Sequence, residues 1–448
     1  MTNLAEKAST GVKWVTLAKF INIGVGILRI SILTRFLDKA DFGLMAIVYF
    51  IVGFADLFMD MGISTAILHK QNINEKEYSS LYWLNFMVSI VLYGIAVLAA
   101  PLVATYYKEP ELGVLVPLVA INFILSAIGR QFNIVYQKEL NFYVITVIEI
   151  IAVVFSLIVA VVLAIYGLGV YALAYSTIAQ FAVYNLLFLY LGFKKNSVRF
   201  HFSLKETYPF LRIGVYQMGG QIINYCSKEL DVLIIGKMLG AEQLGIYNLA
   251  KQLAVKPIAF INPIITEVAS PVLAIMQNSK EQLKDSYVKL IKMTSSVNLV
   301  IYLLMFVFSD LLIRVMYGAH YEQCAVILRL FCVYMYLRSI NNPVGSLLIA
   351  TGRTDLDLKW NIFMLFITAF MLYLGSMFDV IGILISLNVL LIIVFVPAWY
   401  VFYKGLINLP LKDYVKAVLV SPSDYKQLFH LFKKHFLFKK PVDTPPQY

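Results

Sequence analysis

Long apolar runs, each about the length of one membrane crossing, follow one another along almost the whole chain. An α-helix rises about 1.5 Å per residue, so about 20 apolar residues span the hydrocarbon core of a bilayer. Because that core offers no water to backbone N–H and C=O groups, such runs favour helices over open sheets. The pattern predicts twelve spans: 14–34, 43–63, 81–104, 113–134, 142–164, 169–192, 211–235, 244–266, 290–309, 324–350, 360–376 and 380–402.

Composition agrees with this pattern. The mean hydropathy is +0.78 and only 14% of residues are charged, values far from those of soluble globular domains. The short alternating segments of a transmembrane β-barrel are absent from the sequence. The expected fold class is therefore an all-α polytopic membrane protein. Since the N-terminus shows no small-residue cleavage site after a short apolar core, the first span is expected to stay in the mature protein.

Lysine and arginine in the loops set the expected orientation, because cytoplasmic loops are enriched in both. Most of the basic loop residues lie on the side of the N-terminus. The opposite side carries only Arg35, Lys39, Lys108, Lys237 and Arg314. Both termini are therefore expected to face the cytoplasm. The net charge of +11 follows mostly from this bias and does not indicate a nucleic-acid partner.

The longest basic loop, FKKNSVRFHFSLKETYPFLR, divides the spans into two sets of six. It predicts an N-terminal lobe (1–192), a basic cytoplasmic linker (193–210), a C-terminal lobe (211–403) and a basic cytoplasmic tail (404–448). Within the tail, residues 424–440 alternate Phe and Leu with Lys at helical spacing. Such a segment suits a membrane surface with anionic lipids, and a short peripheral helix without a special role is the alternative.

The two predicted lobes share a weak internal repeat. TRFLDKADFGL (34–44) aligns without gaps on GKMLGAEQLGI (236–246), so that Gly43 aligns with Gly245. Six spans per lobe give both lobes the same orientation, which predicts a parallel repeat about a pseudo-twofold axis along the membrane normal. Two such lobes are expected to enclose a central cavity that opens to either side in turn.

Polar residues follow one face of the seventh predicted span. Gln217, Gln221, Asn224, Lys228 and Asp231 fall within a sector of about 80° on a helix. A charge at the bilayer centre costs at least about 2.5–3.5 kcal/mol, so such residues face a bundle interior or a water-filled cavity. The stripe therefore predicts the side of this span that faces the cavity.

Other spans carry comparable polar faces. The first span has Lys19, Asn22, Gly26 and Arg29 within about 80°. Further charged positions are Asp56 and Asp60 in the second span, Lys251 in the eighth and Arg338 in the tenth. Together they predict a polar cleft in which basic residues outnumber acidic ones.

Each of these charges also has a structural interpretation. Lys19 and Arg29 can extend their head groups to the interface, and Lys228 is a candidate for an ion pair with Asp231 or with an aspartate of the second span that holds helices together. Asp56, Asp60 and Asp231 are compatible with charge balance, a proton relay or a Na⁺ site. Glu149 in the fifth span is a lone acid with either a structural or a functional role.

Several kinds of catalytic chemistry lack their motifs. The sequence contains no GxxxxGK[ST] loop, HExxH or GxSxG, which argues against ATP hydrolysis and hydrolytic catalysis. Three cysteines form no CxxC pair, so neither a metal site nor another cofactor is expected. Asp41-Phe42-Gly43 spells a kinase triplet without its companion motifs, and Gly43 is expected to serve the turn into the second span. The chain is therefore expected not to be an enzyme.

Several segments resemble one branch of a transporter superfamily. They are RFLDKADFGL (35–44), DMGISTA (60–66), YQKELNF (136–142) and ATGRTDL (350–356). They are similar to the polysaccharide-transport branch of the multidrug/oligosaccharidyl-lipid/polysaccharide (MOP) exporters, with colanic-acid-type exporters and O-antigen flippases as the nearest groups. The resemblance runs from about residue 8 to about residue 403. It implies two six-helix lobes in a V shape and alternating access without ATP.

The resemblance also implies a cargo, an undecaprenyl-diphosphate-linked oligosaccharide flipped to the outer leaflet of the bacterial cytoplasmic (inner) membrane for lipopolysaccharide or other surface polysaccharide biosynthesis. A lipid diphosphate is anionic, which matches a basic cleft. The expected substrate-binding residues are Lys19, Asn22, Arg29, Gln221, Asn224, Lys228, Lys251 and Arg338. The expected charge-balancing or ion-coupling residues are Asp56, Asp60 and Asp231.

The other expected partners are membrane lipids, H⁺ or Na⁺ as a coupling ion, and the polysaccharide polymerase machinery. Two alternative functions stay open from the sequence. A cation-coupled multidrug antiporter is expected to have an acidic or aromatic cavity, whereas this one is predicted to be basic. A membrane-integral glycan polymerase usually needs a large extramembrane loop, and the longest loop here has about twenty residues.

Overall fold

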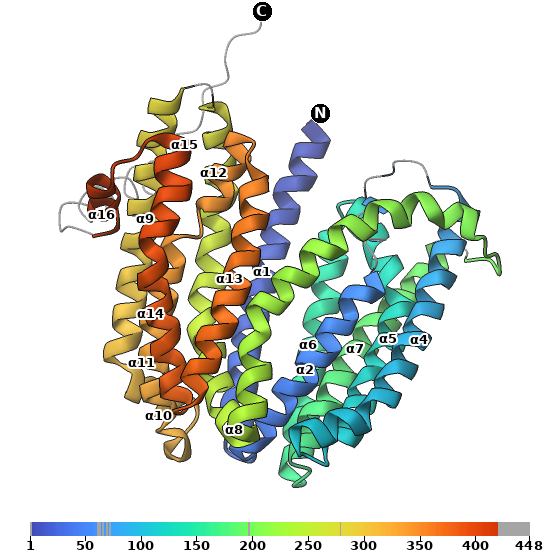
Figure 1. Ribbon diagram of the computed structural model, residues 1–448. Helices are drawn as coiled ribbons and strands as arrows, with labels where there is room; N and C mark the ends of the chain where they lie inside the picture. The colour runs from blue at the N-terminus through green and yellow to red at the C-terminus, as the bar shows by residue number, and fades with distance from the viewer. Residues whose placement is uncertain are drawn as a thin grey trace, which may run out of the picture. The chain divides into compact units, whose positions relative to one another are not determined.

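The computed structural model describes residues 2–60, 64, 67–68, 70, 73–195, 198–277 and 279–419. Long helices dominate these residues, and no strand occurs among them (Figure 1). In chain order the longer helices are α1 (Thr2–Leu33), α2 (Lys39–Asp60), α4 (Glu75–Tyr107), α5 (Leu112–Lys138), α6 (Phe142–Ile165), α7 (Val170–Lys195), α8 (Leu204–Ile275), α9 (Lys280–Val307), α11 (Cys324–Ile340), α13 (Thr354–Ser376) and α14 (Val380–Ala398). The shorter elements are α10 (Ser309–Met316), η1 (Ala319–Tyr321), α12 (Val344–Thr351), η2 (Trp399–Lys404), α15 (Gly405–Ile407) and α16 (Leu411–Val418).

Ten helical stretches among the described residues are long and apolar enough to cross a membrane. They correspond to ten of the twelve predicted spans, and they confirm the class of an all-α polytopic membrane protein. The seventh and eighth predicted spans both lie in α8. At Gly240 this helix adopts φ 84° and ψ 176°, a conformation that glycine accepts because it lacks a Cβ. Gly240 thus divides α8 into two helical segments, 204–239 and 241–275.

The chain forms two compact units. Unit 1 contains Met1–Ala250, Asp310–Ile327 and Asn361–Ile383, and unit 2 contains Lys251–Ser309, Leu328–Trp360 and Leu384–Tyr448. Unit 1 contains the whole predicted N-terminal lobe together with segments of the predicted C-terminal lobe, whereas unit 2 contains only residues of the predicted C-terminal lobe and tail. The lobe boundaries at 192 and 211 and the pseudo-twofold axis therefore remain predictions.

In unit 1, α4, α5, α6 and α7 pack on one another, α1 packs on α6 and α2 on α5 (Figure 1). Small residues allow the closest of these contacts. A Cβ on Gly129 of α5 would lie 2.5 Å from the carbonyl oxygen of Asn185 in α7, so only glycine permits this approach. An aromatic cluster closes one end of the same interface with Tyr82, Phe132 and Phe188.

A second close contact in unit 1 joins α2 to the second segment of α8. A Cβ on Gly43 would lie 1.8 Å from the carbonyl oxygen of Ala241, and a Cβ on Gly245 would lie 1.8 Å from that of Lys39. Gly43 lies inside α2, so the expectation that it serves the turn into this helix is wrong. Its role is to let two backbones touch. We refer to this contact as the glycine crossing.

In unit 2, three buried tyrosines join α16 to η2 and α9: Tyr414, Tyr403 and Tyr287. The ring centroids of Tyr403 and Tyr414 lie 4.4 Å apart, and those of Tyr287 and Tyr403 lie 5.7 Å apart. The hydroxyls of Tyr403 and Tyr414 donate to Asn341 Oδ1 at 2.9 Å and 3.3 Å. The start of the predicted tail is therefore a helix packed on its own unit. The amphipathic segment 424–440 lies outside the described residues.

Candidate functional site

Four helices of unit 1 line a partly open pocket of about 560 Å³. Two of its walls are single helix faces, because the lining residues follow one another at intervals of three to four. They are Val15, Ala18 and Lys19 of α1, and Phe142, Ile145, Thr146 and Glu149 of α6. Gln137 of α5 and Gln180, Phe181 and Tyr184 of α7 complete the lining. Lys19 is the one predicted substrate-binding residue among the described residues that line this pocket.

Glu149 has a partner on α1. Asn22 donates from Nδ2 to Glu149 Oε1 at 2.5 Å. The other amide atom, Asn22 Oδ1, is buried and has no hydrogen-bond partner among the described residues. The sequence left the role of Glu149 open. The structure places it against a predicted substrate-binding residue and in the same pocket as Lys19.

Arg29 lies further along α1. Its Nη1 donates to Ser156 Oγ of α6 at 3.3 Å, and Ser156 is buried and donates in turn to the carbonyl oxygen of Ser176 at 2.8 Å. This chain of contacts anchors one nitrogen of the guanidinium. Arginine carries five N–H donors in a fork, so one such contact orients the group and leaves it able to bind an anion.

Asp56 of α2 pairs with Arg130 of α5. Nη1 and Nη2 of Arg130 lie 3.2 Å and 3.3 Å from the two carboxylate oxygens, a bidentate arrangement. This ion pair is compatible with a charge-balancing role of Asp56, and the choice among charge balance, a proton relay and a Na⁺ site stays a prediction. The side chain of Asp60 lies outside the described part of the chain.

The polar stripe on the first segment of α8 divides into two parts. Gln221, Asn224 and Lys228 are exposed, whereas Asp231 is 9% exposed. The hydroxyl of Tyr247 donates to Asp231 Oδ2 at 2.6 Å, and the backbone N–H of residue 232 donates to Oδ1 at 2.9 Å. These contacts hold the Asp231 carboxylate inside unit 1, and its charge-balancing or ion-coupling role stays a prediction. The side chain of Gln217 is not among those described.

Tyr225 fixes the same segment of α8 to α2. Its ring centroid lies 5.6 Å from that of Phe50 and 6.3 Å from that of Phe54, and its hydroxyl donates to the carbonyl oxygen of Phe50 at 2.9 Å. Gly53 of α2 provides the space for the Tyr225 hydroxyl. This tyrosine stands between Asn224 and Lys228 in the sequence, and it sets how that part of α8 is rotated.

Lys251 and Arg338 belong to unit 2. Lys251 is half-buried and Arg338 is exposed. The convergence of these two residues with Lys19, Arg29 and Lys228 on one cleft remains a prediction.

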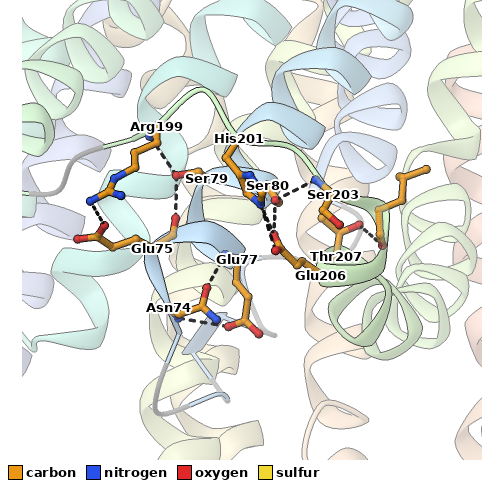
Figure 2. Close-up of polar contacts among 11 residues, drawn as sticks. Asn74, Glu75, Glu77, Ser79, Ser80, Arg199, His201, Ser203, Glu206 and Thr207 are labelled. Atoms are coloured by element: carbon orange, nitrogen blue, oxygen red, sulfur yellow. Dashed lines mark hydrogen bonds and ion pairs between the residues drawn. The ribbon is translucent and has the colours of Figure 1, made fainter.

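The predicted linker holds a set of contacts that the sequence did not suggest. Residues 198–206, here called the strap, lie against the first turns of α4 (Figure 2). The backbone N–H groups of Arg199 and Ser203 donate to the hydroxyls of Ser79 and Ser80, both at 3.1 Å. Both serines are fully buried. Ion pairing of Arg199 with Glu75, at 2.7 Å, adds to the attachment.

The strap ends on a carboxylate at the start of α8. The hydroxyl of Ser80 donates to Glu206 at 2.6 Å, and His201 Nε2 lies 3.1 Å from both oxygens of the same carboxylate (Figure 2). The hydrogen bond from Ser80 lowers the pKa of Glu206 below its usual value, and the bond to His201 adds to the shift. Trp83 completes the attachment, because its ring stacks on Phe200 with centroids 5.0 Å apart. The strap is thus fixed to α4.

Within the described ranges, no group of three His, Cys, Asp or Glu residues is arranged to hold a metal ion.

Comparison with known proteins identifies the family. Residues 32–326 match the family model described as "Polysaccharide biosynthesis protein". The chain is 33% identical over 418 residues to the lipopolysaccharide biosynthesis protein WzxC of Escherichia coli (strain K12), a match that covers 93% of this chain and 85% of WzxC. It is 28% identical over 361 residues to the teichuronic acid biosynthesis protein TuaB of Bacillus subtilis (strain 168), covering 81% of this chain and 75% of TuaB.

A solved structure shares the fold. The lipid II flippase MurJ, in an inward closed conformation, matches with a TM-score of 0.74 at 14% identity and covers 95% of this chain and 93% of its own. The family model and the similarity to WzxC together show that this chain belongs to the polysaccharide biosynthesis protein family.

Proposed function

We propose that this protein moves an undecaprenyl-diphosphate-linked oligosaccharide from the inner to the outer leaflet of the bacterial cytoplasmic membrane, as one step of surface polysaccharide biosynthesis. The observation that carries the proposal is the 33% identity to a lipopolysaccharide biosynthesis protein over 93% of the chain. The ten stretches that are able to cross a membrane supply the required setting. In this proposal the protein is a transporter and not an enzyme.

Cations on α1 and α8 support an anionic cargo. Arg29 is oriented by Ser156, and Lys228 is exposed on its helix. A guanidinium matches the geometry of phosphate oxygens, and an ammonium adds a compact charge. We assign the diphosphate to Arg29 and Lys228 of unit 1, while a role for Lys251 and Arg338 of unit 2 stays a prediction from the sequence.

The acidic residues of unit 1 support a balancing role. Asp56 is engaged by Arg130 and Asp231 by Tyr247. In this proposal Asp56 balances the charge of Arg130, Asp231 is held by hydrogen bonds from neutral groups, and a coupling ion, H⁺ or Na⁺, binds elsewhere. Both termini face the cytoplasm, and the polysaccharide polymerase machinery receives the cargo at the outer leaflet.

The experiment is complementation in a host strain that lacks its own copy of the gene. Two quantities are measured: surface polysaccharide, and the fraction of lipid-linked oligosaccharide that impermeant periodate oxidises in spheroplasts. The intact protein restores both. Arg29→Ala and Lys228→Ala lower both and leave lipid-linked oligosaccharide inside, while Lys280→Ala, an exposed lysine of α9, behaves as the intact protein. Immunoblots of the membrane fraction check insertion.

Normal periodate accessibility in the deletion strain would refute the proposal. A deletion strain that loses resistance to cationic drugs while its amount of surface polysaccharide stays unchanged would favour a multidrug antiporter instead.

A further inference from the structure

The pocket of unit 1 has a lining that does not suit a diphosphate. It contains one cation, Lys19, and one carboxylate, Glu149, so these two side chains together contribute no net formal charge. A diphosphate is a multiply charged anion, and a carboxylate in the same low-dielectric pocket repels it. Sites that bind phosphate groups instead gather several charged donors such as arginine and lysine. The pocket therefore takes another part of the cargo, or another ligand.

The rest of the lining combines ring faces with neutral hydrogen-bonding groups. Phe142, Phe181 and Tyr184 supply three aromatic rings, and Gln137 and Gln180 supply two primary amides. Each amide offers both donors and an acceptor, while a carboxylate only accepts. A ligand that satisfies this set carries many hydroxyl groups, each a donor and an acceptor, together with an apolar C–H face. A pyranose ring has both properties.

We propose that this pocket is a sugar subsite that holds a hexose residue of the oligosaccharide head group, an inference that rests on the function proposed above. An aromatic ring of the lining packs on the C–H face of the sugar. Glu149 and Gln180 hydrogen-bond its hydroxyls. Lys19 donates to a hydroxyl or a ring oxygen and does not bind the diphosphate.

The contact between Asn22 and Glu149 supports this assignment. Asn22 holds one oxygen of the carboxylate at 2.5 Å, which fixes the orientation of Glu149 before a ligand arrives. Restricting a side chain in advance lowers the entropy lost on binding. Tyr184 is held in the same way, because Asn133 Nδ2 donates to its hydroxyl at 2.8 Å. Two of the groups that face the ligand are thus preorganised by neighbours outside the lining.

Size and position agree with the assignment. The volume of about 560 Å³ falls within the range of about 300–1,000 Å³ typical of small-molecule pockets. Lys19 precedes Arg29 by ten residues on α1, which is about 15 Å along the helix axis. The sugar and the diphosphate therefore have separate places on one helix, with Arg29 on the diphosphate.

Two probes separate the two parts of the cargo. One is the free reducing oligosaccharide released by mild acid from the lipid-linked intermediate of the host, which lacks both lipid and phosphate. The other is farnesyl diphosphate, which lacks sugar. Binding of each is measured by calorimetry to the full-length protein in lipid nanodiscs. The variants are Glu149→Gln, Gln180→Ala and Arg29→Ala, with Glu281→Gln, an exposed glutamate of α9, as the control.

We expect Glu149→Gln and Gln180→Ala each to weaken binding of the oligosaccharide about tenfold, equivalent to about 1.4 kcal/mol, and to leave farnesyl diphosphate within twofold of the intact protein. Arg29→Ala gives the opposite result, and Glu281→Gln changes neither. Size-exclusion profiles show whether each variant is folded, and the two pocket variants test the site independently.

The outcomes separate this inference from the proposed function. An intact protein that binds farnesyl diphosphate but not the oligosaccharide overturns the sugar subsite alone. So does a Glu149→Gln variant that binds both probes normally but no longer transports, because Glu149 then acts in ion coupling. An intact protein that binds neither probe overturns both.

Discussion

A single methyl group at the glycine crossing is expected to destabilise unit 1 measurably. In Gly43→Ala the new Cβ would lie 1.8 Å from the carbonyl oxygen of Ala241, whereas close C–H···O contacts have C···O distances of about 3.3–3.6 Å. The two helices must therefore separate by about 1.5 Å. Because the atom in the way belongs to a backbone, no change of rotamer relieves the overlap.

The magnitude follows from two terms. Overpacking in a close-packed interior costs typically about 1–3 kcal/mol, and each weak C–H···O interaction that the separation breaks is worth about 0.5–1 kcal/mol. We expect Gly43→Ala to lower the free energy of unfolding by about 2–3 kcal/mol. Gly245→Ala should cost the same, because its Cβ would lie at the same distance from Lys39 O. The double variant should cost less than the sum, since both act on one contact.

The assay is unfolding of the purified protein in mixed detergent micelles of increasing SDS content, followed by circular dichroism. Gly94→Ala is the matched control, since this glycine of α4 has no atom within 4 Å of an added Cβ and alanine is the better helix former. If Gly43→Ala unfolds at the same SDS fraction as Gly94→Ala, the crossing does not constrain the helices and the reasoning is refuted.

Three further changes test other contacts of unit 1. The first is a double-mutant cycle of Asp56→Asn and Arg130→Gln, measured by SDS unfolding. The coupling free energy between the two side chains should be at most about 1 kcal/mol, because both are partly exposed. A coupling free energy several times larger would mean that the ion pair is desolvated. Ser80→Ala removes the hydrogen bond that the hydroxyl accepts from Ser203 N and the one that it donates to Glu206. Each is worth about 0.5–1.5 kcal/mol, so trypsin should cleave the strap after Arg199 roughly 5- to 150-fold faster. Thr105→Ala is the control, and unchanged cleavage is the contrary result. The lowered pKa of Glu206 means that its contribution to strap attachment is complete above the usual glutamate pKa and is lost as the pH falls through the lowered value. Tryptophan emission, to which Trp83 stacked on Phe200 contributes, should therefore shift as the pH falls through the lowered pKa of Glu206, and less so in Glu206→Gln.

The spans could be predicted because the bilayer dictates their length and polarity, and ten of them have counterparts in the described helices. Their ends were less accurate where a helix continues beyond the apolar run. Helix α4 begins at Glu75 and not at residue 81, because Asn74 accepts a hydrogen bond from Glu77 N and Glu77 reaches back to Asn74 N. This capping box is legible in the sequence as Asn-x-x-Glu, but hydropathy alone does not register it.

The partners of the polar residues could not be predicted, because periodicity gives the face of a helix and not the neighbour of that face. The polar face of the first span predicts that Asn22 faces a cavity, and the sequence assigns Glu149 no partner. Their hydrogen bond joins positions 127 residues apart. The strap carries even less signal, since Ser79 and Ser80 are common residues whose importance lies only in being buried beside the linker.

The glycine crossing gives the weak sequence repeat a structural explanation, because the two aligned segments are the ones that contact each other. The alignment of 34–44 on 236–246 pairs Lys39 with Ala241 and Gly43 with Gly245. In the structure Gly43 of α2 faces the carbonyl oxygen of Ala241, and its aligned partner Gly245 of α8 faces the carbonyl oxygen of Lys39. The two contacts are therefore equivalent under the alignment. Reciprocal contacts of this kind arise wherever a surface meets its own equivalent about a twofold axis. A glycine at one aligned position then requires a glycine at the other, because both backbones are equally close, and this gives a physical reason for a similarity that the sequence presents only as a pattern.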